Sequence, residues 1–298
     1  MTGDRLHRFS FQNAPIRGNW VRLDAVLAEV FARQPYPERL QAVLAEALCA
    51  VAMIADTIKF QGTISLQSRG RGPLTTLLAE CRSRSVLRGI ARWNRSAGIA
   101  GDAPLNVLLG DGQLAISLVD SDPVTPRPVS YQGLVALDHD DLAGNLEGYF
   151  ATSEQLPTRF YFGRAGQTVT GLLLQRLPAD DDATEIELDQ HDTDWDLIQE
   201  AAGTSSADLA TLSPQALLEQ LFPSRPLTLQ PARPLSFGCT CSRDRSTASL
   251  DAVPAEELLD ILDSDGEVTV TCEICGTVYV YDPIDIHLVM QREAPQLH

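Results

Sequence analysis

Four cysteines near the C-terminus have the spacing of a metal site. One residue separates Cys239 from Cys241, two separate Cys272 from Cys275, and thirty lie between the two pairs. Two close pairs brought together make a tetrahedral four-sulfur site, which zinc satisfies as a four-coordinate thiolate complex. Gly276 follows the second pair and lets its turn present backbone N–H groups to sulfur. The spacing therefore predicts a four-cysteine zinc site, with an iron–sulfur cluster as the alternative.

The same cysteines also favour redox chemistry. A disulfide between Cys239 and Cys241 closes a small ring, and strain makes such a bond easier to reduce. Cys272 and Cys275 have the C-x-x-C spacing of many redox sites. Thiolates are the form that an oxidant attacks, and oxidation of either pair removes two ligands. Structural zinc contributes on the order of 10–16 kcal/mol to small metal domains, against roughly 3–5 kcal/mol from a core of ~60 residues. Loss of the ion is therefore expected to unfold this segment, whereas an inert zinc ribbon is the alternative.

Length and composition are those of a globular protein. The 298 residues are 44% hydrophobic and 21% charged. The sequence contains no continuous run of 18 apolar residues, so no membrane span is predicted. The start, MTGDRLHRFSFQNAP, lacks the apolar stretch of a secretory signal, so a reducing, cytoplasmic location is expected. A net charge of −17 argues against nucleic acid and membrane surfaces as partners.

Charge is unevenly distributed along the chain. Residues 1–178 carry a net charge of +2, residues 179–235 of −10 and residues 236–298 of −9. This break in composition predicts three segments: an N-terminal α+β domain over 1–178, an acidic and helical linker over 179–235, and a C-terminal zinc module over 236–298.

Hydrophobic periodicity gives the elements of the first segment. Apolar residues at helical spacing predict helices over 19–33, 38–58 and 141–155. Runs rich in β-branched residues predict strands over 60–68, 74–81, 86–93, 131–137, 158–163 and 168–177. Residues 104–118 are expected to form two strands around Gly110-Asp111-Gly112. The segment should therefore be an antiparallel sheet with a few helices, an α+β fold.

The remaining elements position the cysteines. The acidic run 179–192 predicts a solvated loop, followed by helices over 194–202 and 213–222, the second with Ser213 as N-cap and Pro214 in its first turn. The proline-rich 223–234 should be extended and irregular. Residues 253–266 predict a helix that ends at Gly266, and 267–282 predict a β-hairpin. A face expected to be buried on the first domain consists of Leu209, Leu212, Leu217, Leu218, Leu221 and Phe222.

Several motifs resemble one bacterial family, that of the thirty-three-kilodalton redox-regulated heat-shock chaperones (HslO). The resemblance rests on FGCTCS at 237–242, VTCEICGTVYVYD at 270–282, KFQGTISLQSRGRGPLTTLLAE, YFATSEQLPT and their order. It implies an ATP-independent holdase of the stress response whose reduced, zinc-bound form is inactive. Oxidation is then expected to pair Cys239 with Cys241 and Cys272 with Cys275, release zinc, and unfold the module and the linker. The exposed surface would bind unfolding client proteins, with a homodimer as the active form.

Other residues suggest weaker sites. Cys49 is expected to be a core residue and Cys81 a half-buried structural thiol, while the histidines are expected at the surface: His7, His139, His191, His287 and His298. The run Ser153-Glu154 is expected at a helix end, and Gly70 and Gly72 in a turn. Two other functions compete with the holdase: a constitutive zinc-ribbon interaction module, and a thiol–disulfide oxidoreductase at Cys272 and Cys275. The oxidoreductase needs a βαβ context that the predicted hairpin lacks, so no enzyme is expected.

Overall fold

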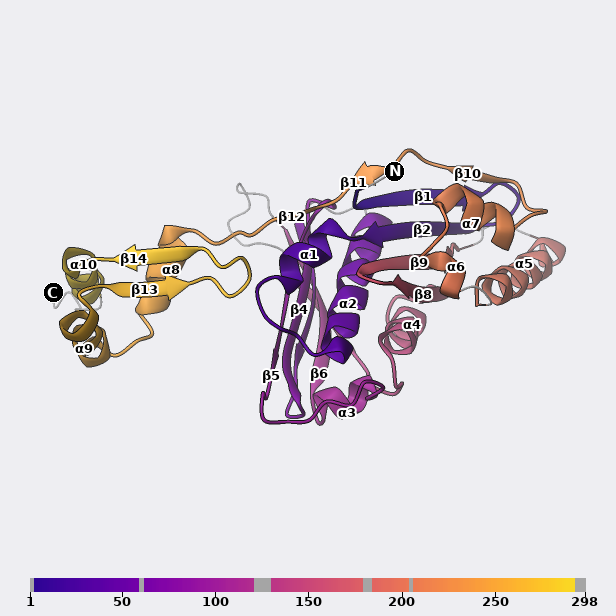
Figure 1. Ribbon diagram of the computed structural model, residues 1–298. Helices are drawn as coiled ribbons and strands as arrows, with labels where there is room; N and C mark the ends of the chain where they lie inside the picture. Colours follow the sequence, from indigo (N-terminus) through magenta and orange to yellow (C-terminus); the bar gives the residue numbers. More distant parts are fainter. Residues whose placement is uncertain (1–2, 59–61, 121–129, 179–183, 204–205, 293–298) are drawn as a thin grey trace. The chain divides into compact units, whose positions relative to one another are not determined.

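The computed structural model describes residues 3–58, 62–120, 130–178, 184–203 and 206–292 (Figure 1). Contacts group the chain into two compact units, residues 1–237 and 238–298. The fold class is mixed α+β, as predicted. Residues 179–235 were expected to be a separate linker, but the grouping by contacts includes them in the first unit. That this segment unfolds separately stays a prediction.

A long apolar helix forms the centre of the first unit. Helix α2 spans Glu38–Thr57 after Pro37, which confirms the predicted helix. By length and composition α2 is apolar enough to cross a membrane, but most of it is buried inside this unit. Its side chains pack against two β-sheets at once, so the same cluster of buried residues includes strands from both sheets. This double packing explains why its buried face is so broad.

The first sheet has the strand order β10-β1-β2-β9-β8, and β11 also pairs with β1. Its strands are β1 (Arg5–Phe11), β2 (Ile16–Leu23), β8 (Thr158–Ala165), β9 (Thr168–Arg176), β10 (Leu227–Leu229) and β11 (Arg233–Pro234). The helix predicted over 19–33 is wrong, because β2 precedes the short helix α1 (Ala25–Phe31). Strand β2 is covered on both faces and therefore lacks the alternation typical of a strand.

Helix α1 begins where a distant carboxylate caps it. Asp4 accepts hydrogen bonds from the backbone N–H groups of Asp24 (2.6 Å), Ala25 (3.1 Å) and Val26 (2.6 Å). These donors have no partner within a helix and need one from outside. The cap lies about twenty residues from the helix along the chain, where local periodicity gives no sign of it.

The second sheet has the order β12-β5-β4-β3-β6-β7. Its strands are β3 (Gly62–Arg69), β4 (Leu74–Arg82), β5 (Val86–Trp93), β6 (Gln113–Asp120), β7 (Ser130–Val135) and β12 (Ser236–Phe237). The predicted hairpin over 104–118 is wrong: α3 (Leu105–Leu109) replaces its first strand. Gly110 ends this helix at φ +59°, so the glycines serve a helix end. Helix α4 (Leu142–Thr152) lies within the predicted range 141–155, and its N-cap Asp141 accepts a hydrogen bond from Gly144 N–H.

The acidic stretch before the second unit is more helical than predicted. Residues 179–183 lie outside the described part of the chain, but the loop expected up to residue 192 is wrong, because α5 spans Glu185–Gly203. Its carboxylates have partners elsewhere: Asp194 pairs with Arg225 at 2.6 Å and Asp192 with Arg176. Trp195 and Ile198 on the same helix are buried.

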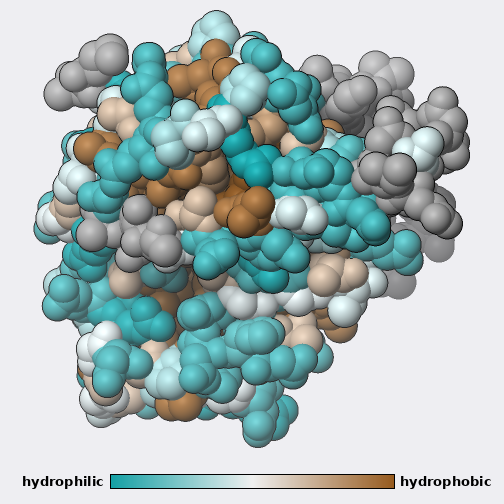
Figure 2. All heavy atoms as spheres, turned by 90° about the vertical axis from the view of Figure 1, so that its right-hand side faces the viewer, coloured by the Kyte–Doolittle hydropathy of each residue, from teal (hydrophilic) through white to brown (hydrophobic). Residues whose placement is uncertain are grey.

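Helices α6 (Ser206–Leu209) and α7 (Pro214–Leu221) complete this region. Ser213 caps α7 by accepting a hydrogen bond from Ala216 N–H at 3.2 Å, as predicted. The predicted apolar face packs on the first sheet in one cluster with Phe9, Phe11 and Trp20; its buried members are Leu209, Leu217, Leu218, Leu221 and Phe222. On the face that Figure 2 shows, hydrophobic atoms form patches separated by hydrophilic side chains.

The second unit combines a two-stranded sheet with three helices among its described residues. Helices α8 (Arg243–Leu250) and α9 (Ala255–Asp265) precede the hairpin of β13 (Val268–Thr271) and β14 (Val278–Tyr281), and α10 (Pro283–Arg292) follows it. Gly266 ends α9 at φ +80°, and the hairpin has its predicted place. The core of this unit is small; over residues 238–292 its buried hydrophobic residues are Leu250, Leu258, Val268, Tyr281, Ile286 and Val289.

Candidate metal centre

Two separate segments bring the four cysteines together. Cys239 and Cys241 lie immediately before α8, whose N-cap is Ser242. Cys272 follows β13 and Cys275 lies in the tight turn before β14. The turn is closed by two hydrogen bonds, from Cys272 N–H to Thr277 O (2.9 Å) and from Gly276 N–H to Cys272 O (2.7 Å).

Glycine is required where this turn reverses. Gly276 adopts φ +73°, a left-handed conformation that side chains disfavour. The turn therefore depends on the Cys-x-x-Cys-Gly order in the sequence.

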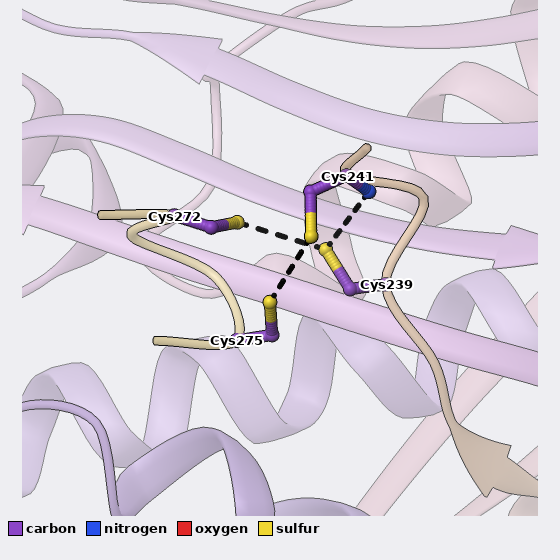
Figure 3. Close-up of side chains that lie close together, drawn as sticks. All are labelled: Cys239, Cys241, Cys272 and Cys275. Atoms are coloured by element: carbon purple, nitrogen blue, oxygen red, sulfur yellow. Dashed lines mark hydrogen bonds between the residues drawn. The ribbon is translucent and has the colours of Figure 1, made fainter. Parts of the chain in front are cut away.

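The sulfur atoms converge on one point (Figure 3). Cys239 Sγ lies 3.7 Å from Cys272 Sγ, and Cys241 Sγ lies 3.3 Å from Cys275 Sγ. All four sulfurs lie within 4.8 Å of one another. Four zinc–sulfur bonds of about 2.3 Å in a tetrahedron place the sulfurs about 3.8 Å apart. The cluster therefore fits a tetrahedral zinc ion, and its donors are the thiolates that zinc prefers.

An arginine ties the first cysteine segment to the hairpin. Arg243 donates to Val280 O at 2.8 Å, pairs with Asp285 at 2.7 Å and lies over the ring of Tyr281, 4.5 Å from its centre. Arg245 donates to the carbonyl oxygen of Thr240 at 3.1 Å. Sequence analysis did not identify these contacts, since single arginines after a cysteine pair carry no distinctive pattern.

The sulfurs differ in their surroundings. Cys241 N–H donates to Cys239 Sγ at 3.4 Å, while partial burial raises the pKa of Cys239 to about 12. Partial burial acts in the same direction on Cys275, but hydrogen bonding to Thr277, whose Oγ1 lies 3.1 Å from the sulfur, lowers its pKa to about 6. All four side chains are partly exposed, so an oxidant in solution can reach the cluster.

No other cysteine or histidine in the described part of the chain joins the cluster. Cys49 is a core residue, as expected; Cys81, expected to be half-buried, is fully buried in the same core, and burial raises its pKa to about 12. The ring of His287 hydrogen-bonds to Pro283 O at 2.8 Å within its own helix.

The other candidate motifs have structural contacts. Glu154 accepts a hydrogen bond from Tyr149 at 2.8 Å. Gly70 and Gly72 lie in a turn held by hydrogen bonds to backbone carbonyls.

Comparison with known proteins identifies the family. The family model described as Hsp33 protein matches residues 4–282 of this chain. The chain belongs to the Hsp33 family. The match runs through both units and includes all four cysteines.

Named relatives of this Hsp33 chain are similar along nearly their whole length. The 33 kDa chaperonin of Shewanella frigidimarina is 38% identical over 287 residues, covering 96% of this chain and 95% of that protein. The 33 kDa chaperonin of Pseudomonas savastanoi is 37% identical over 285 residues, with 95% and 92% covered. The crystal structure of the 33 kDa chaperonin of Thermotoga maritima has the same fold, with a TM-score of 0.74, 21% identity, and 97% and 98% of the two chains covered. Membership of the Hsp33 family supports a chaperone function.

Proposed function

We propose that this chain is a redox-regulated, ATP-independent holdase of the cytoplasm. Its reduced, zinc-bound form is inactive, and oxidation converts it into a form that binds unfolding proteins and prevents their aggregation. The observation that carries the proposal is the convergence of four partly exposed cysteine sulfurs from two chain segments within 4.8 Å. Family membership supports the chaperone part of the proposal.

Cys239, Cys241, Cys272 and Cys275 hold one zinc ion in the reduced form. The bound ion supplies a four-way crosslink between the segment before α8 and the hairpin turn. The protein contributes the turn that Gly276 allows and the Arg243 contacts that keep the two segments adjacent. Six buried hydrophobic residues make a core too small to replace this crosslink.

Oxidation removes the ligands in pairs. Two thiolates give two electrons to hydrogen peroxide; a sulfur–sulfur bond forms, the O–O bond breaks, and with two protons from solvent the two oxygens leave as two water molecules. We assign the bonds to neighbours in the sequence, Cys239 with Cys241 and Cys272 with Cys275. With these pairs formed, no crosslink joins the two segments, and the second unit loses its order.

Client binding follows from the exposure of apolar surface. The cluster beneath α5, α6 and α7 contains large side chains that are buried in this state, among them Trp195, Leu217 and Phe222. Once the second unit unfolds, the preceding 179–235 segment is destabilised and this surface opens. Large exposed apolar surfaces bind other apolar chains, and the oxidised form acts as a homodimer on unfolded clients. Nucleic acids and membranes are not partners.

One experiment tests the proposal against its alternatives. Zinc-loaded protein is treated with peroxide at mildly raised temperature while zinc release, far-UV circular dichroism and suppression of client aggregation are followed. We expect the three signals to change together, to reverse with reductant and to be unaffected by ATP. Client binding that is the same in both redox states indicates a constitutive zinc-ribbon module. Turnover of a small disulfide indicates an oxidoreductase.

A further inference from the structure

The C-terminal end of α2 is surrounded by arginines from distant parts of the chain. The four guanidinium groups there come from β1, β2, the β4–β5 turn and β11: Arg8, Arg17, Arg84 and Arg233. One fully buried carboxylate, Asp56, pairs with both Arg8 and Arg233. These strands and the helix belong to the first unit, whose elements Figure 1 shows.

Part of the role of these arginines is to satisfy the carbonyl groups at the C-terminal end of α2. Three of the arginines donate to its last carbonyl groups: Arg8 to Asp56 O (2.6 Å), Arg17 to Thr57 O (3.0 Å) and Arg84 to Ile58 O (3.0 Å). A helix C-terminus carries about half a negative charge. Together with the Asp56 carboxylate this offsets less than half of the four positive charges, so the site keeps an excess of about two and a half. In a chain of net charge −17 this is a concentrated positive site.

The excess charge faces a cavity. A space of about 420 Å³ is lined by Arg8, Arg17 and Arg84 and by the Asp56 carboxylate that Arg8 neutralises, with further polar groups from Ser10, Asn19 and Gln230. The hydrogen bonds of the three arginines to the described residues use Nε or Nη2, which leaves Nη1 of each for a ligand. Burial lowers the pKa of Arg17, and the neighbouring positive charge of Arg8 lowers it further.

The turn that carries Arg84 goes against local preference. Ser83 and Arg84 form the two central residues between β4 and β5, at φ +48° and +61°. Such a two-residue hairpin turn favours Asn and Gly, because other side chains are strained there. Departures of this kind concentrate at functional sites. Arg84 therefore places a guanidinium beside the cavity, although an arginine at this position makes the turn less stable.

We propose that this cavity binds a tetrahedral oxydianion of the phosphate class, either inorganic phosphate or the phosphate group of a small monoester. Each remaining Nη1 can donate charge-assisted hydrogen bonds to such an oxygen, and the three guanidinium charges less that of Asp56 leave about two positive charges to match a dianion. The volume equals that of roughly fourteen liquid waters, which leaves room for a substituent on the phosphate. The site is formed by residues of the first unit, whereas the four cysteines belong to the second.

The test uses the reduced, zinc-loaded full chain. Isothermal titration calorimetry with inorganic phosphate, and separately with glycerol phosphate, is run in chloride buffer of matched ionic strength. The test variant is Arg84→Asn, because asparagine suits the turn and keeps the protein folded while the guanidinium is removed. The control is Arg69→Asn, which removes one exposed arginine. Arg69 lies at the end of β3, about 23 Å along the strand from its first residue, Gly62.

We expect saturable binding at one site per chain, weakened at least tenfold in Arg84→Asn and less than twofold in Arg69→Asn. Tighter binding of the monoester identifies a phosphorylated metabolite as the source, and equal binding identifies the free ion; both support the site. The rise of the thermal midpoint in phosphate over chloride should follow the same order among the variants. Absence of saturable binding of both probes, or equal weakening in the two variants, overturns the proposal.

Discussion

Replacing one cysteine of the cluster should unfold the second unit and leave the first domain intact. Cys272→Ser removes the sulfur that lies 3.7 Å from Cys239 and therefore breaks one link between the two segments. Structural zinc contributes on the order of 10–16 kcal/mol in small metal domains at neutral pH. Loss of even half of this, roughly 5–8 kcal/mol, exceeds the ~3–5 kcal/mol that a single small core supplies. The six buried hydrophobic residues of this unit cannot keep it folded.

The assay is a comparison of amide spectra of the full chain by nuclear magnetic resonance, with zinc affinity measured by competition with a chelator. We expect the amide signals of residues 238–298 to lose their dispersion and those of residues 1–178 to stay in place. Thr271→Ser is the matched control, since it changes a neighbouring exposed hydroxyl residue and no sulfur.

Two results would refute this reasoning. If residues 238–298 keep dispersed amide signals in Cys272→Ser at low zinc occupancy, the metal is not what holds the unit together. If the signals of 1–178 collapse as well, the chain is a single cooperative unit and the proposed division is wrong.

Three further perturbations probe the first unit. Asp56→Asn should lower the free energy of unfolding by about 1–3 kcal/mol in urea titrations, because the buried carboxylate loses its ion pairs with Arg8 and Arg233, which are partly screened by solvent; no change would mean that the pairs contribute nothing. Leu217→Ala should cost about 2–5 kcal/mol and let peroxide activate client binding at a lower temperature; an unchanged activation temperature would separate α7 from the switch. Burial raises the pKa of Glu46 to about 7, partly offset by Arg39, so the folded state favours the protonated carboxyl, and this contribution is lost as pH rises through 7. Glu46→Gln should therefore stabilise the protein by about 2–3 kcal/mol at pH 8 and much less at pH 5, and an equal effect at both values would contradict the assigned shift.

Local signals in the sequence predicted the elements that position the cysteines. The C-x-C and C-x-x-C spacing, Gly266 at a helix end and the alternation around Cys272 act within a few residues, so the hairpin and the sulfur cluster could be predicted together. Helix α2 was equally clear because twenty consecutive residues share its periodicity.

The errors have a different physical origin. Strand β1 (Arg5–Phe11) was not predicted, and one of its pairing partners, β10, lies more than two hundred residues away along the chain. The helix predicted over 194–202 is confirmed as the second part of α5, but the first part was missed because its carboxylates indicate a solvated loop; one of them, Asp192, pairs with Arg176 from elsewhere in the fold. Asp56 and Arg233 lie 177 residues apart, and no pattern in the sequence marks them as a pair.

The strands just before the second unit close both sheets of the first. β10 and β11 border β1, and two residues later β12 runs parallel to β5. If the segment that contains β10, β11 and β12 detached, β1 and β5 would become edge strands. Each would then have a row of backbone N–H and C=O groups without partners. Such edges accept any extended polypeptide without regard to its side chains. Detachment of this one segment would thus create two strand edges that can pair with other chains independently of sequence, in addition to the apolar surface exposed with α7.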